Sequence, residues 1–204
     1  MPIEARTGDG DSMQVTFSRI PDHEWGQVLI ERDDRVIYRM HAGPITAALP
    51  HDLVHFTVED ALGIADGIWG AIAGGVVFRS MTHVSGRRPP HADERSAELK
   101  RVHRDALHYA ELLGGLVESV AEKPGADVAA LSREMFKNVP AGAPGVDAIG
   151  TAVTALRRAE ERWRALPIGA SLVLPWPGHR RVGALPRRHA QDRGRGRAKR
   201  AGAA

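Results

Sequence analysis

Two histidines and a glutamate, His51, His55 and Glu59, are spaced four residues apart in the otherwise apolar stretch 49–60. If this stretch is helical, steps of about 100° per residue place the three side chains on one narrow face, with Asp52 beside them. Two imidazoles one turn apart can bind a single zinc ion, because their ring nitrogens converge. The spacing therefore predicts a zinc site on this helix face.

The predicted site needs further groups, because one helix seldom completes a tetrahedral set of ligands. Glu59 can serve as a third ligand, or it can hold the imidazole of His55 in one tautomer from outside the metal's ligand set. Three residues elsewhere can supply the missing partner: His83, His108 and Glu111. His108 and Glu111 share the longest helical segment, which makes that segment the natural opposite wall. In a metal-dependent hydrolase of this kind, Asp52 would act as the base.

A structural interpretation fits the same residues. His55 and Glu59 form an i, i+4 pair of the kind that stabilises helices. Asp52 lies in the first turn, where the helix dipole favours an acid, and His51 can cap or pack. The protein would then be a non-catalytic interaction module, and the residue pattern leaves both interpretations open.

The elements that must position these residues follow from periodicity. Alternation of apolar and polar residues predicts strands over residues 13–20, 27–32 and 35–40, the last two joined by a hairpin at Asp33 and Asp34. Repeats of three and four residues predict helices over residues 50–62, 66–73, 91–123, 127–136 and 145–166. Gly63 is expected to cap the first of these helices. Residues 171–176 are strand-like and can return to the sheet.

These elements predict an α+β fold, in which a small antiparallel N-terminal sheet, joined by a C-terminal strand, packs on a mostly helical body. We expect a flexible leader over residues 1–12, with Met1 or Met13 as the start, and a single domain over residues 13–178. The chain has no cysteine, which excludes disulfides and thiolate sites. It also lacks an apolar signal segment or membrane span, so a cytoplasmic protein is expected.

The basic character of the chain is concentrated at its C-terminal end. Residues 179–204 hold eight arginines and one lysine against one aspartate, a local charge of +8, whereas the net charge of the whole chain is +3. The remainder is therefore mildly acidic. With few large apolar residues, this tail is expected to be disordered. Its Arg-Gly alternation suits nucleic-acid contacts, although it has no aromatic residue for base stacking.

The motif that begins at His51 resembles three known patterns. The run from His51 to His55, H-D-L-V-H, is similar to the H-E-x-x-H of zinc metalloproteases, with Asp52 in the place of the glutamate. That resemblance implies that both histidines hold zinc and that Asp52 polarises water. The same run resembles the H-D-x-x-H of the coenzyme Q biosynthesis protein of the mitochondrial inner membrane. Gly67 stands where that protein's motif has a glutamate.

The third resemblance covers most of residues 13–176. A group of bacterial proteins without an assigned activity, mostly actinobacterial, has the pattern P-H-D-L-x-H-[FY]-x-V-E followed by a glycine-rich W/F-G segment. Residues 50–59, residues 67–70 and the late Trp-Arg-Ala-Leu-Pro of residues 163–167 fit this pattern. The resemblance implies a shared fold and assigns no reaction.

Overall fold

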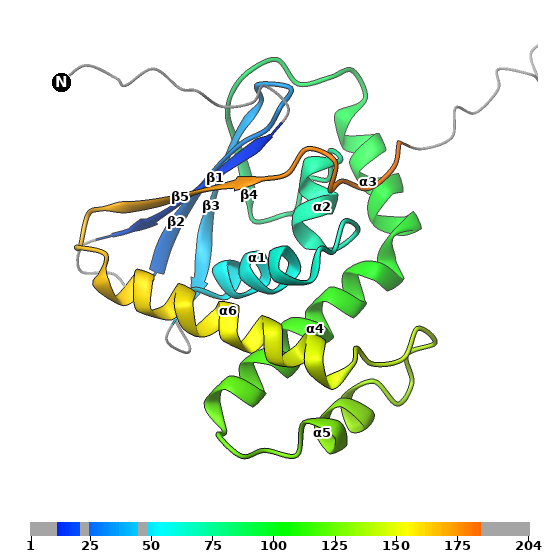
Figure 1. Cartoon of the computed structure of the whole chain (residues 1–204). Coiled ribbons are helices and arrows are strands. Elements are labelled where there is room, and N and C mark those ends of the chain that lie inside the picture. Colours follow the sequence, from blue (N-terminus) through cyan, green and yellow to red (C-terminus); the bar gives the residue numbers. More distant parts are fainter. Residues whose placement is uncertain (1–11, 21–24, 45–48, 185–204) are drawn as a thin grey trace, which may run out of the picture.

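The structure is a computed structural model that describes residues 12–20, 25–44 and 49–184 (Figure 1). A five-stranded sheet has the strand order β4-β3-β2-β1-β5, and each neighbouring pair is antiparallel. The strands are β1 (Met13–Arg19), β2 (Trp25–Glu31), β3 (Ile37–Pro44), β4 (Met81–Ser85) and β5 (Ser171–Trp176). The predicted α+β class and the return of the C-terminal strand to the sheet are confirmed.

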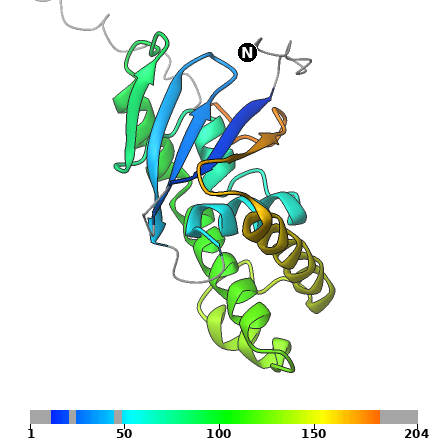
Figure 2. The same cartoon turned by 90° about the vertical axis from the view of Figure 1, so that its left-hand side faces the viewer.

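Alternation along the strands decides which face of the sheet is buried. In β1, Val15 and Phe17 are buried, while Thr16 between them is partly exposed. Val15 lies opposite Ile30 of β2 and Leu174 of β5, so apolar side chains line up across the strands. The helices gather on this apolar face (Figure 2).

Six helices occur in the described residues. They are α1 (His51–Leu62), α2 (Ile68–Ala73), α3 (Ala92–Val102), α4 (Arg104–Glu122), α5 (Val128–Met135) and α6 (Val146–Ala165). Helix α1 lies between the sheet and the other helices, where it contacts β3, α2, α4 and α6 (Figure 1). Gly63 ends α1 in the left-handed conformation with φ of 67°, as predicted. None of these helices is both long enough and apolar enough to cross a membrane.

Two elements differ from the prediction. Strand β4 was not expected, because Met81 is its only buried residue and the other four are exposed, so no alternation marks it. The single helix expected over residues 91–123 is two helices, α3 and α4, separated at His103. No proline or glycine marks this break, and the apolar repeat runs through it.

The C-terminal part of the fold extends past the predicted boundary at residue 178. The indole Nε1 of Trp176 donates to the carbonyl of Arg180 at 2.6 Å, and Arg180 Nη1 lies 2.7 Å from Asp60 Oδ1. Val182 is buried, and its N–H donates to the carbonyl of Gly70. The first residues of the predicted tail therefore fasten α1 and α2 to the sheet. Residues 1–11 of the predicted leader, which spans residues 1–12, and residues 185–204 lie outside the described residues.

Arg19 at the end of β1 caps helix α6. Its Nη1 donates to the carbonyl of Leu166 at 2.7 Å and lies 3.4 Å from that of Arg164 and 3.5 Å from that of Trp163. Because a cation at a helix C-terminus satisfies the last carbonyls and opposes the helix dipole, we expect Arg19→Met to lower the free energy of unfolding by about 1–2 kcal/mol.

Urea denaturation measures this loss, with Arg158→Met as the matched control, since Arg158 is exposed within α6. Equal stability of the two variants would contradict the assignment of a capping role to Arg19.

Candidate metal centre

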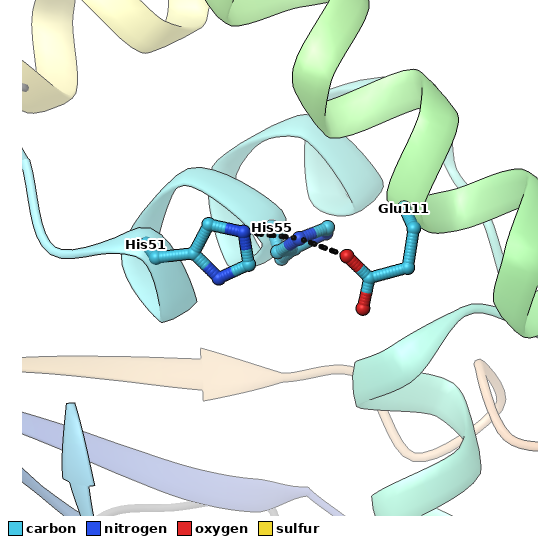
Figure 3. A group of neighbouring side chains, drawn as sticks. All are labelled: His51, His55 and Glu111. Atoms are coloured by element: carbon cyan, nitrogen blue, oxygen red, sulfur yellow. Dashed lines mark hydrogen bonds and ion pairs between the residues drawn. The ribbon is translucent and has the colours of Figure 1, made fainter. Parts of the chain in front are cut away.

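Helix α1 places His51 and His55 one turn apart, and α4 crosses it so that Glu111 points at His55 (Figure 3). His55 Nε2 lies 3.3 Å from His51 Nε2 and 3.3 Å from Glu111 Oε2. All three ligand atoms lie within 4.8 Å of one another. The structure therefore brings together both predicted histidines and one of the predicted partners from the long helical segment.

Two of the three spacings in this group fit a tetrahedral metal site. Two ligands that each lie about 2.0–2.1 Å from zinc at a tetrahedral angle are about 3.4 Å apart. The two contacts of His55 Nε2, both 3.3 Å, agree with this edge length, and the third pair of ligand atoms lies within 4.8 Å.

The proton of His55 Nε2 lies where a cation would sit. This nitrogen carries at most one hydrogen, which it can donate to the carboxylate of Glu111, while the exposed ring of His51 reaches solvent. A divalent cation would replace that proton and would be held by lone pairs of all three groups.

Exposure differs across the group. His55 is buried at 2% exposure, whereas His51 is exposed and the side chain of Glu111 is 55% exposed. The group is thus anchored on its inner side and open to solvent on its outer side. A metal held here would keep a position for water, as catalytic zinc sites do.

The charges of the group are coupled. Burial lowers the pKa of His55, but the hydrogen bond and charge of Glu111, together with the charges of Glu59 and Asp52, outweigh it and raise this pKa above its ordinary value. The hydrogen bond to His55 holds the pKa of Glu111 below its usual range against burial. A metal must therefore displace the proton of His55, and its binding is expected to strengthen as pH rises.

Gly114, on α4, makes room for the ring of His55. A Cβ atom at this position would lie 2.8 Å from His55 Cε1, closer than Cβ atoms pack in proteins, and 3.1 Å from its Nδ1, a tight contact. His55 Nδ1 is buried and has no hydrogen-bond partner in the described residues. This role of Gly114 was not predicted, although two adjacent glycines inside a long helix are a signal of close packing.

Glu59 does not belong to the group. Its carboxylate oxygens accept hydrogen bonds from the backbone N–H groups of Ile68 and Trp69, both at 3.0 Å, and no hydrogen bond between described residues joins it to His55. Burial raises the pKa of Glu59 to about 7, against these N–H groups and the charge of His55. Glu59, which was predicted as a third ligand or as an orienting group for His55, therefore caps the start of α2 and lies outside the three grouped residues.

The other predicted residues lie around or away from the group. His83 is on β4, where its Nε2 lies 3.0 Å from the carbonyl of Gly86. His108 is exposed on α4 and is not one of the three grouped ligands, although its charge helps to lower the pKa of Glu111. Asp52 is one of the acids whose charge raises the pKa of His55.

The basic tail enters the described structure only at its start. Arg180 pairs with Asp60, and Arg181 pairs with Asp33 at 2.6 Å, so both arginines contribute to the fold. The Arg-Gly run that suggested nucleic-acid contacts lies outside the described residues.

Comparison of the chain with protein-family models, with curated proteins and with solved structures gives no match.

Proposed function

We propose that His51, His55 and Glu111 bind a divalent metal ion. We expect this ion to be zinc, because two imidazoles and a carboxylate are ligands that zinc prefers. The observation that carries this proposal is the convergence of two ring nitrogens and one carboxylate oxygen within 4.8 Å of one another, with His55 Nε2 3.3 Å from each of the other two atoms. Burial of His55 beside exposed His51 and Glu111 supports a site with an open coordination position.

The open position supports metal-dependent hydrolysis as the activity. Zinc with three protein ligands lowers the pKa of a bound water to about 7 and polarises a carbonyl or phosphoryl group. Asp52, whose charge acts on His55, is the carboxylate that we assign as general base. This is the role that Asp52 takes in the resemblance to H-E-x-x-H metalloproteases.

Elemental analysis of the full chain, purified without an affinity tag and dialysed against zinc, tests metal binding. We expect about one zinc per chain, and loss of that zinc in His51→Ala, His55→Ala and Glu111→Gln. His108→Ala is the matched control, since His108 lies less than one turn from Glu111 on α4 but outside the ligand group. Zinc retained by all three ligand variants would overturn the proposed site.

Hydrolysis is tested separately on the zinc-loaded chain with activated carboxylic and phosphoric esters. We expect turnover that is lost with a chelator and restored by zinc, and a loss of about 100-fold or more in Asp52→Asn at unchanged zinc content. A chain that binds zinc but shows no chelator-sensitive turnover would leave the metal site standing and refute the hydrolase.

A further inference from the structure

A cavity of about 320 Å³ lies apart from the metal group. Its walls come from the turn between β2 and β3, from the end of α2 and the residues after it, and from the start of α3, which lies beside α2 (Figure 1). His51, His55 and Glu111 are not among its lining residues. Its volume is in the range of pockets that bind small molecules.

Arg32 presents a buried charged donor to this cavity. Its side chain is 6% exposed, and its Nε and Nη2 are held by the carboxylate of Asp34, with Nε 3.2 Å from Oδ1. Its guanidinium carbon lies 5.6 Å from the centre of the Tyr38 ring. The remaining nitrogen, Nη1, has no hydrogen-bond partner in the described part of the chain. It lies 3.9 Å from the place where a Cβ of Gly75, another lining residue, would stand.

The charges around the cavity leave one positive charge unbalanced. Arg32, Arg95 and Arg181 line it, together with Asp33 and Asp34. Asp34 is engaged by Arg32, and Asp33 by Arg181 at 2.6 Å. Arg95 is exposed on α3, and no hydrogen bond or ion pair joins its side chain to a described residue. A single negative charge on a ligand would therefore be balanced by the cavity.

The rest of the lining is apolar. Six residues form this part of the wall: Tyr38, Ala73, Val77, Pro89, Ala92 and Leu99. Tyr38 and Leu99 are already buried, but the other four are partly exposed. An inorganic anion would leave these four side chains uncovered, whereas a ligand with a hydrocarbon or aromatic body would cover them. A carboxylate carries a single negative charge near neutral pH and accepts N–H donors from guanidinium groups in a planar arrangement.

We propose that this cavity binds a small organic monocarboxylate, whose carboxylate accepts hydrogen bonds from Arg32 Nη1 and Arg95 and whose body lies against Val77 and Pro89. The two arginines differ in what they contribute. Arg32 is held by Asp34 and is already desolvated, so it orients the carboxylate of the ligand. Arg95 is free to move onto the ligand, and its positive charge balances that of the carboxylate.

Calorimetric titration of the full chain with benzoate tests this inference, with a chelator present so that the metal group takes no part. We expect a dissociation constant of about 1 mM or lower, and binding weaker by about tenfold or more for benzamide, which has the same shape without the charge. Chemical shifts of the backbone amides of Gly75 and Leu99 locate the bound ligand.

Arg95→Ala is expected to weaken benzoate binding by about tenfold, while Arg104→Ala, which removes the same charge from the exposed start of α4 outside the cavity, leaves it unchanged. Arg32→Lys keeps the charge but cannot both pair with Asp34 and present Nη1, so it also weakens binding. Equal binding by Arg95→Ala and the unsubstituted chain would overturn the inference. So would equal binding of benzamide and benzoate, or binding of inorganic phosphate in place of benzoate.

Discussion

Glu59→Gln is expected to flatten the dependence of the unfolding free energy on pH between about 4.5 and 7. The carboxyl group of Glu59 has an ordinary pKa of 4.5, which applies to the unfolded chain, and burial raises it to about 7 in the fold. Below 4.5 the group is protonated in both states. As pH rises, the unfolded chain releases this proton first, so the contribution of Glu59 to stability is lost by the time pH passes 7.

The size of this effect follows from the two pKa values. Each unit of difference corresponds to about 1.4 kcal/mol, so the loss across this interval is about 3 kcal/mol. The titration of His55 also lowers the free energy of unfolding as pH rises, but at higher pH. Its pKa is raised above 6.5 in the fold, so its contribution is present below 6.5 and is lost as pH rises through the folded value. A slope that remains in Glu59→Gln above pH 6.5 is assigned to His55.

Urea denaturation between pH 4 and pH 8 in a chelating buffer measures these slopes. Glu122→Gln, at an exposed glutamate near the end of α4, controls for the loss of one carboxylate. A Glu59→Gln variant with the same slope as Glu122→Gln would contradict the titration of Glu59 in this interval. Glu59→Ala should be less stable than Glu59→Gln, because it leaves the N–H groups of Ile68 and Trp69 without an acceptor.

The contacts of Glu59 could not be predicted from the sequence. A helical wheel correctly puts Glu59 near His51 and His55 in angle, but it contains no information about what packs on each turn of the helix. The turn that carries Glu59 meets the start of α2, whose N–H groups need an acceptor. Proximity on one helix therefore correctly placed the two histidines together, whereas Glu59 packs against α2 outside their group.

The contact of Glu111 with His55 and the break at His103 are two features that a single helix pattern does not predict. Glu111 was one of three possible partners in sequence, and the crossing of α1 and α4 selects it over His83 and His108. The crossing depends on packing between helices, which local periodicity does not encode. The division into α3 and α4 is invisible for the same reason, since the apolar repeat continues through residue 103. Most of the sheet, in contrast, could be predicted, because β1, β2 and β3 carry their own alternation and β5 is a short apolar run.

Substitution of the two adjacent glycines of α4 by alanine is expected to change stability in opposite directions. Alanine favours helix over glycine by about 1 kcal/mol. A Cβ at Gly115 would lie 3.6 Å from Met135 Cε, an ordinary contact, so Gly115→Ala should stabilise the fold. A Cβ at Gly114 would lie 2.8 Å from His55 Cε1, so Gly114→Ala should instead destabilise it by about 1–3 kcal/mol.

Zinc affinity separates these variants further. Because His55 Nε2 lies within 3.3 Å of both other ligand atoms, displacement of its ring by a methyl group at residue 114 disturbs both contacts. We expect Gly114→Ala to weaken zinc binding by about 10- to 100-fold, the range seen when groups that orient a ligand are changed. Gly115→Ala should bind zinc as the unsubstituted chain does. Zinc affinity that is unchanged in Gly114→Ala, in a variant destabilised as expected, would mean that the ring of His55 does not hold the metal in the position that α1 gives it.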